Sequence, residues 1–220
     1  MSGSATRSVL LLGATGLVGA AALRLLLDDR RWSRVVVVSR RPVDAAPSPK
    51  LEVVLLPDLD RLTDAAPSFA VDAILCALGT TIRQAGSEAR FRRVDHDYPL
   101  AAARLGQRSG VRHFGLVSAL GADPHSRVFY NRVKGDVEEG LRRAGLPSVT
   151  ILRPSLLLGP RQAFRLGEVL MKPLAPLVPG RYRPVSAGAV ARVLVESART
   201  STPGVEIIES RDIRRLGAGE

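Results

Sequence analysis

The chain has 220 residues, of which 45% are hydrophobic and only 4% aromatic, and its formal net charge is +11. This length allows one domain with a substantial core of Leu, Val, Ile and Ala, and no segment reaches the about 20 uninterrupted apolar residues of a membrane-spanning helix. The 32 basic residues are spread along the chain in ones and twos, which argues against nucleic acid as a partner.

A glycine-rich turn interrupts the first apolar stretch of the chain. Residues 9–12 predict a buried strand, glycines follow at positions 13, 16 and 19, and an Ala- and Leu-rich helix then runs to about Asp28. In such a strand–turn–helix unit the first glycine allows a sharp turn, the second lets the backbone approach a diphosphate, and the third lets the helix pack closely. Exposed N–H groups and the helix dipole favour an anion here. The residues expected to contact such a ligand are Gly13, Thr15, Gly16, Leu17, Val18 and Gly19.

Three features bear on the compartment, on disulfide bonding and on metal binding. Helical spacing continues through residues 23–27, where a mature chain would begin if residues 7–22 were a signal peptide. We therefore expect no targeting segment and a cytoplasmic location.

The single cysteine, Cys76, excludes an internal disulfide and lies in an apolar run that predicts a buried, inert thiol. The three histidines lack the spacing of metal ligands, so no metal site is expected.

The second predicted strand, residues 34–39, is a run of β-branched residues, which indicates burial on both faces. Chains that prefer NAD usually place an Asp or Glu near the end of this strand, and here the residues are Ser39, Arg40 and Arg41. A hydroxyl and two guanidinium groups can bind a 2′-phosphate that an acidic residue would repel. We therefore expect NADP(H) rather than NAD. The alternative is that both arginines are solvated loop residues.

Two further strands are predicted at residues 51–56 and 71–78. The first leads to the edge where an adenine would lie, and Asp58 there either accepts a hydrogen bond from the adenine amino group or caps the following helix. The second ends at a glycine, which again allows a close approach of the backbone to a ligand. The cofactor contacts expected at these strand ends are Asp58, Leu59, Ala77, Leu78 and Gly79.

The middle of the chain continues the alternation of strands and helices. Residues 82–93 are polar without a clear period and predict a loop that leads into a helix. A helix is expected over residues 95–109, with Asp95 or Asp97 as its cap, and a fifth strand then ends at Ser118. This order predicts a doubly wound parallel sheet in three α/β/α layers, with ligands bound outside the carboxyl ends of the strands.

A helix predicted after the fifth strand carries Tyr130 and Lys134, which lie one turn apart on the same face. A phenol with a pKa near ~10 needs a neighbouring cation to act as an acid or base at neutral pH, and Lys134 can supply it. Ser118 can then hydrogen-bond a substrate carbonyl while Tyr130 gives or takes the proton. Glu138 and Glu139 are adjacent on this helix and are expected to be a solvated surface pair.

A sixth strand, residues 149–152, ends at Arg153 and Pro154. The prolines that follow divide the next 30 or so residues into short apolar pieces, too short for an independent core, which predict a lid or side wall over the site. We therefore expect one domain with a nucleotide-binding core over residues 1–153 and a lid or substrate segment that begins at residue 154. The rest of the chain to residue 220 predicts a closing helix at 187–198, a possible edge strand at 205–209 and a polar tail from Arg211.

Several motifs together resemble the short-chain dehydrogenase/reductase superfamily over nearly the whole chain. They are GATGLVG, the strand end at Ser118 and YNRVK. A narrower resemblance is to the atypical group that includes the Tat-interacting protein and its bacterial relatives. The segments similar to that group are SRRP, CALGTT, RVDHDYPL, HFGLVSALGAD, FYNRVKGDVE and ILRPSLLLGPRQ.

This resemblance implies a Rossmann-like fold with NADP(H) in the cleft. By position, Ser118, Tyr130 and Lys134 would form the catalytic triad, Lys134 would also bind the nicotinamide ribose, and Arg153 and Pro154 would lie beside the nicotinamide. The implied function is an NADP(H)-dependent oxidoreductase acting on a small carbonyl compound or alcohol. The alternatives are an NADP(H)-sensing binding protein with little turnover, which allows a protein partner or a homodimer, and an epimerase or dehydratase that retains its cofactor.

Overall fold

The computed structural model describes residues 7–158 and 183–218. The strands are β1 (Arg7–Leu12), β2 (Trp32–Ser39), β3 (Leu51–Leu55), β4 (Ala73–Cys76), β5 (His113–Val117), β6 (Ser148–Arg153), β7 (Leu157–Leu158), β8 (Val185–Ser186) and β9 (Gly204–Glu209). The helices are α1 (Leu17–Asp28), α2 (Ile82–Ala85), α3 (Glu88–Arg92), α4 (Tyr98–Arg108), α5 (Phe129–Arg142), α7 (Ala187–Thr200) and α8 (Ser210–Gly217), with a 3-10 helix η1 (Leu59–Phe69) and a π-helical turn η2 (Arg93–Asp97).

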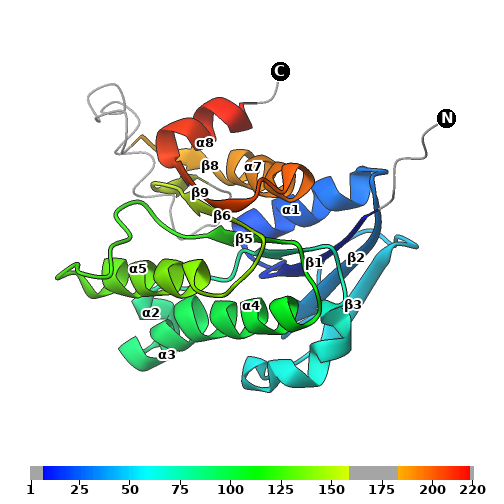
Figure 1. The fold of residues 1–220 in the computed structure, drawn as a ribbon, viewed down its shortest axis with the longest axis horizontal. Helices are drawn as coiled ribbons and strands as arrows, with labels where there is room; N and C mark the ends of the chain where they lie inside the picture. The colour runs from blue at the N-terminus through cyan, green and yellow to red at the C-terminus, as the bar shows by residue number, and fades with distance from the viewer. Residues whose placement is uncertain (1–6, 159–182, 219–220) are drawn as a thin grey trace.

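Seven strands form one parallel sheet in the order β3-β2-β1-β4-β5-β6-β9. Figure 1 shows α1, α7 and α8 on one side of the sheet and α4 and α5 on the other. The predicted doubly wound, three-layer α/β/α fold is thereby confirmed. The strand order reverses between β1 and β4, which is the point where open parallel sheets bind ligands.

Alternate residues of the central strands face opposite sides of the sheet and pack into two cores. Leu11 and Val37 belong to the core that α1 and α7 cover. Leu10 and Val36 belong to the core that α4, α5 and η1 cover. All four side chains are fully buried, so the β-branched run in β2 is covered on both faces as its composition predicted.

Two segments differ from the sequence-based expectation. The segment predicted as a loop, residues 82–93, forms α2, α3 and the start of η2, because Thr81 and Ser87 cap the two short helices with their hydroxyl groups. The predicted polar tail is also wrong, since α8 occupies it. Ile213 is fully buried there, and Gly217 packs so closely on α7 that an added Cβ would lie 2.6 Å from the Ala189 carbonyl oxygen.

Two titratable side chains lie inside the sheet and serve its packing. Cys76 is fully buried, and burial raises the pKa of its thiol to about 12, which confirms the inert thiol that was predicted. His113 stands at the amino end of β5, with Nδ1 2.8 Å from Ser148 Oγ and Nε2 3.1 Å from Ser197 Oγ. Burial lowers the pKa of His113 to about 4, so the ring is neutral at physiological pH.

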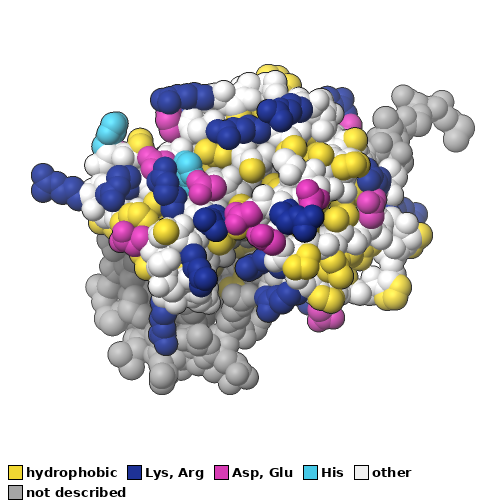
Figure 2. Space-filling model, turned by 90° about the horizontal axis from the view of Figure 1, so that it is seen from below, with side chains coloured by type: hydrophobic (Ala, Val, Ile, Leu, Met, Phe, Trp, Pro, Cys, Tyr) yellow, Lys and Arg dark blue, Asp and Glu magenta, His cyan; other side chains and the backbone are white. Residues whose placement is uncertain are grey.

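The face covered by α4 and α5 carries basic and acidic side chains interspersed with one another (Figure 2). Arg92 forms an ion pair of 2.7 Å with Asp136, and Arg143 forms one of 2.6 Å with Glu139. On this face the positive charge is therefore distributed and not gathered into one block.

Candidate active site

A cleft of about 810 Å³ opens at the carboxyl ends of β1, β4, β5 and β6. Its walls come from the turns that follow these strands and from one face of α5. The predicted site residues that line it are Gly16, Leu17, Val18, Ala77, Leu78, Gly79, Ser118, Tyr130, Lys134 and Pro154. The tertiary structure thus brings together segments that lie more than 130 residues apart in sequence.

The turn after β1 has the tight backbone that its glycines predict. Gly13 has a φ of +84°, and a Cβ there would lie 2.4 Å from the carbonyl oxygen of Ala77. A Cβ on Gly19 would lie 2.0 Å from the Gly13 carbonyl oxygen, so α1 packs directly on the turn. Thr15 lies exposed in the turn. The N-cap residue of α1 is Gly16, which has no side chain to cap the helix and lines the cleft, so the helix N-terminus faces the space where an anionic group could bind.

Tyr130 and Lys134 lie on one face of α5 and both line the cleft. The Tyr130 ring packs on Phe91 with 5.4 Å between the ring centroids. Lys134 is buried, and its Nζ lies 2.8 Å from Oδ1 of Asp95. Burial is the largest single effect and would lower the pKa of Lys134, but the Asp95 carboxylate, with smaller contributions from Tyr130 and Cys76, raises it, and the pKa lies above its ordinary value. Lys134 therefore keeps its positive charge beside Tyr130.

Asp95 is a cleft residue that sequence reasoning missed. The expectation that Asp95 or Asp97 caps α4 is wrong, because α3, η2 and α4 follow one another with helical backbone at the junctions and leave no free helix N-terminus. Asp95 lies inside the π-helical turn and is 1% exposed. Its Oδ2 accepts a hydrogen bond of 2.9 Å from the backbone N–H of Thr80, in the turn after β4. The available signal was an acidic residue in a segment predicted to be a helix beside the cleft. Its place in a π-helical turn, a feature that is frequent at functional sites, is visible only in the structure.

Ser118 lines the cleft at the end of β5, and its hydroxyl donates a hydrogen bond of 2.5 Å to Oε1 of Glu138. The side chain of Glu138 is 3% exposed, so the expectation of a solvated surface pair is wrong for Glu138. Glu139 is 40% exposed and pairs with a surface arginine, as expected. Glu138 is eight residues after Tyr130 and so shares the inward face of α5, where Arg153 supplies the opposite charge.

Arg153 stands at the end of β6 beside the cleft but does not line it. Its Nη2 lies 2.6 Å from Oε2 of Glu138, and its Nη1 lies 3.0 Å from Oε1 of Glu209 in β9. The hydrogen bond with Glu138 is the main reason that the pKa of Arg153 lies above its ordinary value. The guanidinium is thus engaged by two carboxylates, while the next residue, Pro154, reaches the cleft wall.

The residues expected at the 2′-phosphate and the adenine lie outside the cleft lining. Ser39 is buried at the end of β2, and its Oγ accepts a hydrogen bond of 3.4 Å from the N–H of Arg41. Arg40 and Arg41 are exposed. Asp58 caps η1 by accepting a hydrogen bond from the N–H two residues further on, which confirms the capping alternative. Leu59, the first residue of η1, is buried.

Several further residues line the cleft without having been predicted as contacts. Most follow directly after a strand, and that position was the available signal. They are Thr80, Thr81, Gln84, Asp95, Val117, Ala119, Leu120, Gly121, Asn131, Ser155, Leu156 and Leu157. The predicted lid falls mainly on residues 159–182, which lie outside the described residues.

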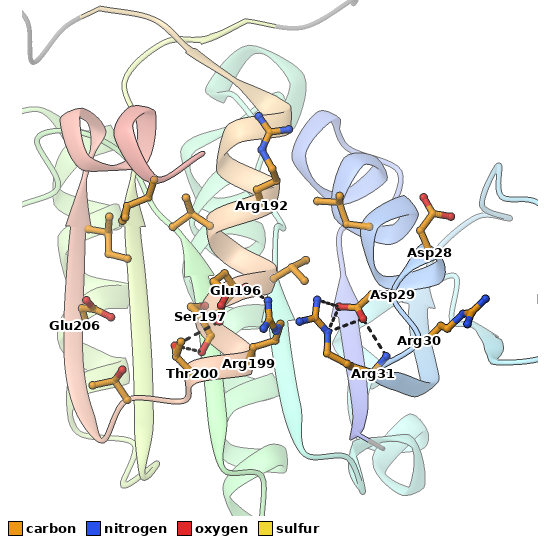
Figure 3. A pocket seen from close by; sticks show the side chains of 16 residues that line it. Asp28, Asp29, Arg30, Arg31, Arg192, Glu196, Ser197, Arg199, Thr200 and Glu206 are labelled. Atoms are coloured by element: carbon orange, nitrogen blue, oxygen red, sulfur yellow. Dashed lines mark hydrogen bonds and ion pairs between the residues drawn. The ribbon is translucent and has the colours of Figure 1, made fainter. Parts of the chain in front are cut away.

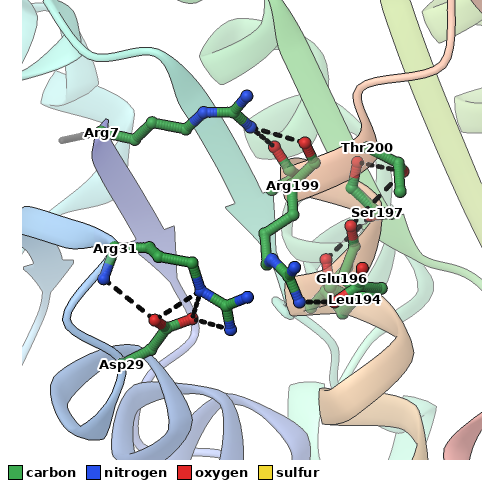
Figure 4. A network of polar contacts seen from close by, with 9 residues as sticks. Arg7, Asp29, Arg31, Leu194, Glu196, Ser197, Arg199 and Thr200 are labelled. Atoms are coloured by element: carbon green, nitrogen blue, oxygen red, sulfur yellow. Dashed lines mark hydrogen bonds and ion pairs between the residues drawn. The ribbon is translucent and has the colours of Figure 1, made fainter. Parts of the chain in front are cut away.

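A second hollow, of about 910 Å³, lies between α1, α7 and β9 (Figure 3). Asp29 and Arg31 pair there at 2.8 Å, Arg199 pairs with Glu196, and the Arg7 guanidinium binds two carbonyl oxygens near the end of α7 (Figure 4). This network lies at the amino ends of β1 and β2, on the opposite edge of the sheet from the glycine turn. The hollow contains none of the predicted site residues.

Comparison with known proteins places this chain in a family of proteins that bind nicotinamide cofactors. A family model described as NAD(P)H-binding matches residues 13–201. Protein HTATIP2 of Rattus norvegicus is 36% identical over 222 residues, which cover 96% of this chain and 89% of the relative. The mitochondrial protein FMP52 of Eremothecium gossypii is 33% identical over 218 residues, which cover 95% and 96% of the two chains. The crystal structure of the Bordetella bronchiseptica enzyme WbmH in complex with NAD+ is similar in fold, with a TM-score of 0.71 at 16% identity, covering 93% of this chain and 76% of that one.

The relatives contradict the expectation of a cytoplasmic location. Several fungal proteins similar to this chain are named as mitochondrial. The lack of a recognisable targeting pattern was therefore a poor guide to location. Among the helices in the described ranges, none combines the length and the apolar composition that crossing a membrane requires.

Proposed function

This chain belongs to the NAD(P)H-binding family and fits the atypical short-chain dehydrogenases/reductases, and on that premise we propose that it is an NADP(H)-dependent oxidoreductase acting on a small carbonyl compound or alcohol. The observation that carries the proposal is that Tyr130, the buried cation of Lys134 and the uncapped N-terminus of α1 all face one cleft. This combination suits a dinucleotide together with a proton-exchanging substrate.

The residues around the glycine turn fit the diphosphate of such a cofactor. The turn has no side chain at Gly13, Gly16 or Gly19, and the first turn of α1 has no side-chain cap. Backbone N–H groups and the positive end of the helix dipole then stabilise the negative charge. In the proposed arrangement Ala77, Leu78 and Gly79 line the path of the cofactor toward α5, as their position in the cleft supports.

In the proposed mechanism two residues of α5, Tyr130 and Lys134, carry out the proton transfer. When bound, the nicotinamide supplies or accepts the hydride. Tyr130 gives a proton to a carbonyl oxygen during reduction, or takes the hydroxyl proton during oxidation, through its phenolic oxygen. Lys134 stabilises the phenolate form because its charge is held beside Tyr130 in a poorly solvated wall. Ser118 is the third polar side chain of the proposed catalytic group, and apolar residues such as Leu120 and Leu157 help to exclude water.

The end of β2 supports NADP(H) over NAD(H). Arg40 and Arg41 are exposed, and neither guanidinium has an ion-pair partner among residues 7–158 and 183–218. A guanidinium without a carboxylate partner is available to a phosphate, and Ser39 adds a hydroxyl at the same strand end. No acidic residue stands at this strand end to bind the ribose hydroxyls of NAD.

The test compares cofactor binding and turnover in the wild type and in Tyr130→Phe. Purified protein is titrated with NADPH and with NADH, and a panel of aldehydes and ketones is then assayed by the loss of NADPH absorbance. We expect Tyr130→Phe to reduce turnover at least about 100-fold while the NADPH dissociation constant changes little, because only the proton donor is lost. Tyr98→Phe, which removes a phenol from α4 outside the cleft, is the matched control and should retain turnover.

Each outcome separates the alternatives. Turnover that is insensitive to Tyr130→Phe would remove the mechanism. Tight NADPH binding without turnover of any carbonyl would favour a cofactor-sensing binding protein. If neither nicotinamide cofactor binds, the proposal fails entirely.

A further inference from the structure

Glu138 continues the face of α5 that carries Tyr130 and Lys134, because the three residues follow at intervals of four. Unlike the other two, Glu138 does not line the cleft, and its side chain is 3% exposed. The cleft residue that it contacts is Ser118, at 2.5 Å. Through this hydrogen bond Glu138 can influence a ligand bound in the cleft.

The hydrogen bond between Ser118 and Glu138 has only one possible donor, the serine hydroxyl. Arg153 donates to both carboxylate oxygens of Glu138, from Nε to Oε1 at 3.1 Å and from Nη2 to Oε2 at 2.6 Å. A carboxylate paired in this way is an acceptor only, so the hydrogen between Glu138 and Ser118 belongs to the serine hydroxyl. A serine has a single hydroxyl hydrogen. Because that hydrogen is used on the buried side, only the lone pairs of Ser118 Oγ remain for the cleft.

The bond with Glu138 is also the stronger competitor for that hydrogen. It is buried and charge-assisted, whereas a bond to a neutral carbonyl oxygen would be neither stabilised by a full charge nor protected from water to the same degree. Turning the hydroxyl toward a ligand would leave the carboxylate with one bond fewer in a buried setting. Ser118 is therefore a poor donor to a substrate carbonyl.

We propose that Glu138 is a positioning residue that holds the hydroxyl hydrogen of Ser118, so that Ser118 meets a bound ligand as a hydrogen-bond acceptor. In this arrangement a carbonyl oxygen takes its hydrogen bond from Tyr130 and not from Ser118. A ligand that carries a hydroxyl group beside the carbonyl finds its partner in Ser118. The cleft then favours hydroxy-carbonyl compounds over the corresponding simple carbonyl compounds, a preference that rests on the proposed function.

The first experiment observes the hydrogen directly. Proton NMR of the NADPH-saturated protein should show a slowly exchanging hydroxyl resonance that is absent in Ser118→Ala and in Glu138→Gln. It should persist in Glu139→Gln, which makes the same charge change at the neighbouring exposed position. Glu138→Gln leaves Arg153 a carboxylate partner in Glu209, and urea unfolding checks that the variant is folded. Should it not fold, Ser118→Ala still identifies the resonance. A resonance that is missing in the wild type, or unaffected by Ser118→Ala, would overturn the proposal.

The second experiment measures the consequence for ligands. Initial rates with NADPH are compared for cyclohexanone and 2-hydroxycyclohexanone, and the ratio of their kcat/KM values is the readout, because a merely structural loss would lower both alike. We expect the wild type and Glu139→Gln to favour the hydroxy compound, and Glu138→Gln to lose about tenfold of that preference, as one hydrogen bond accounts for. An equal preference in all three proteins would contradict the acceptor role. If NADPH binds but no compound of the carbonyl panel reacts, the proposed function fails, and the hydroxyl resonance alone decides the role of Glu138.

Discussion

Lys134 and Asp95 form an ion pair with 2.8 Å between Nζ and Oδ1, and their side chains are only 4% and 1% exposed. The pair joins α5 to the π-helical turn. Through the hydrogen bond from the Thr80 N–H to Asp95 it also joins α5 to the turn after β4. A single buried carboxylate therefore ties two walls of the cleft together.

Replacing Asp95 with Asn should destabilise the protein by about 3 kcal/mol, because a buried ammonium group is left without its countercharge. In the wild type the pKa of Lys134 is raised, so its contribution to stability is complete below its ordinary pKa of 10.5 and is lost as the pH rises through the folded-state value. In Asp95→Asn the main opposition to burial is removed, so burial lowers that pKa, and the loss of stability should instead grow as the pH falls below 10.5.

Urea unfolding of Asp95→Asn at pH 7 and at pH 9.5 checks this sign. The control is Asp136→Asn, which removes the same charge from a partly exposed pair with Arg92 and should cost less than about 1 kcal/mol at both pH values. If the two variants lose the same stability, the buried pair has no special role.

Gly19→Ala should destabilise the protein by about 2 kcal/mol or more and weaken NADPH binding, because a Cβ would lie 2.0 Å from the Gly13 carbonyl oxygen and force α1 away from the turn. Gly188→Ala is the matched control near the start of α7. Its Cβ would meet nothing closer than 3.9 Å, and alanine is the better helix former, so stability should be unchanged or rise by up to about 1 kcal/mol. Thermal unfolding and NADPH titration measure both effects, and equal midpoints for the two variants would refute the close packing.

Arg40→Glu should weaken NADPH binding by about 10- to 100-fold and NADH binding far less, since only NADPH carries the 2′-phosphate that the guanidinium would bind. Arg24→Glu makes the same charge reversal on the exposed side of α1 and controls for the change in net charge. Fluorescence titrations with both cofactors give the four dissociation constants. Equal losses for NADPH and NADH would place Arg40 away from the phosphate.

His113 should make folding sensitive to mild acid. Its folded pKa of about 4 lies below the ordinary 6.5, so the neutral ring stabilises the fold fully above pH 6.5, and this contribution of about 3 kcal/mol is lost as the pH falls from 6.5 toward 4. His113→Asn should lack that component, while His125→Asn, at an exposed position, should keep it. Unfolding free energies at pH 7 and pH 4.5 test the difference, and parallel pH profiles for wild type and His113→Asn would contradict it.

Local patterns in the sequence were sufficient for the layers of the fold and for one side of the cleft. The β-branched run in β2 is a buried central strand, Gly13 has a positive φ, and the four-residue spacing of Tyr130 and Lys134 puts both on the cleft wall. These features depend on residues that are close in sequence. The direction in which their side chains point is set almost entirely by the local backbone conformation. The rule of right-handed crossovers narrows the possible topologies to a few, among which the structure shows the order β3-β2-β1-β4-β5-β6-β9.

The polar partners in and behind the cleft depended on contacts between segments distant in sequence. From local sequence alone, Asp95 is expected to be a helix cap. In the structure its carboxylate has a buried countercharge from Lys134, which lies 39 residues later. From local sequence alone, Glu138 is expected to be a surface residue. In the structure its carboxylate oxygens accept hydrogen bonds from Arg153 and Ser118. A charged side chain can be buried only where another element supplies its counterion and hydrogen bonds, and no local pattern specifies that supply.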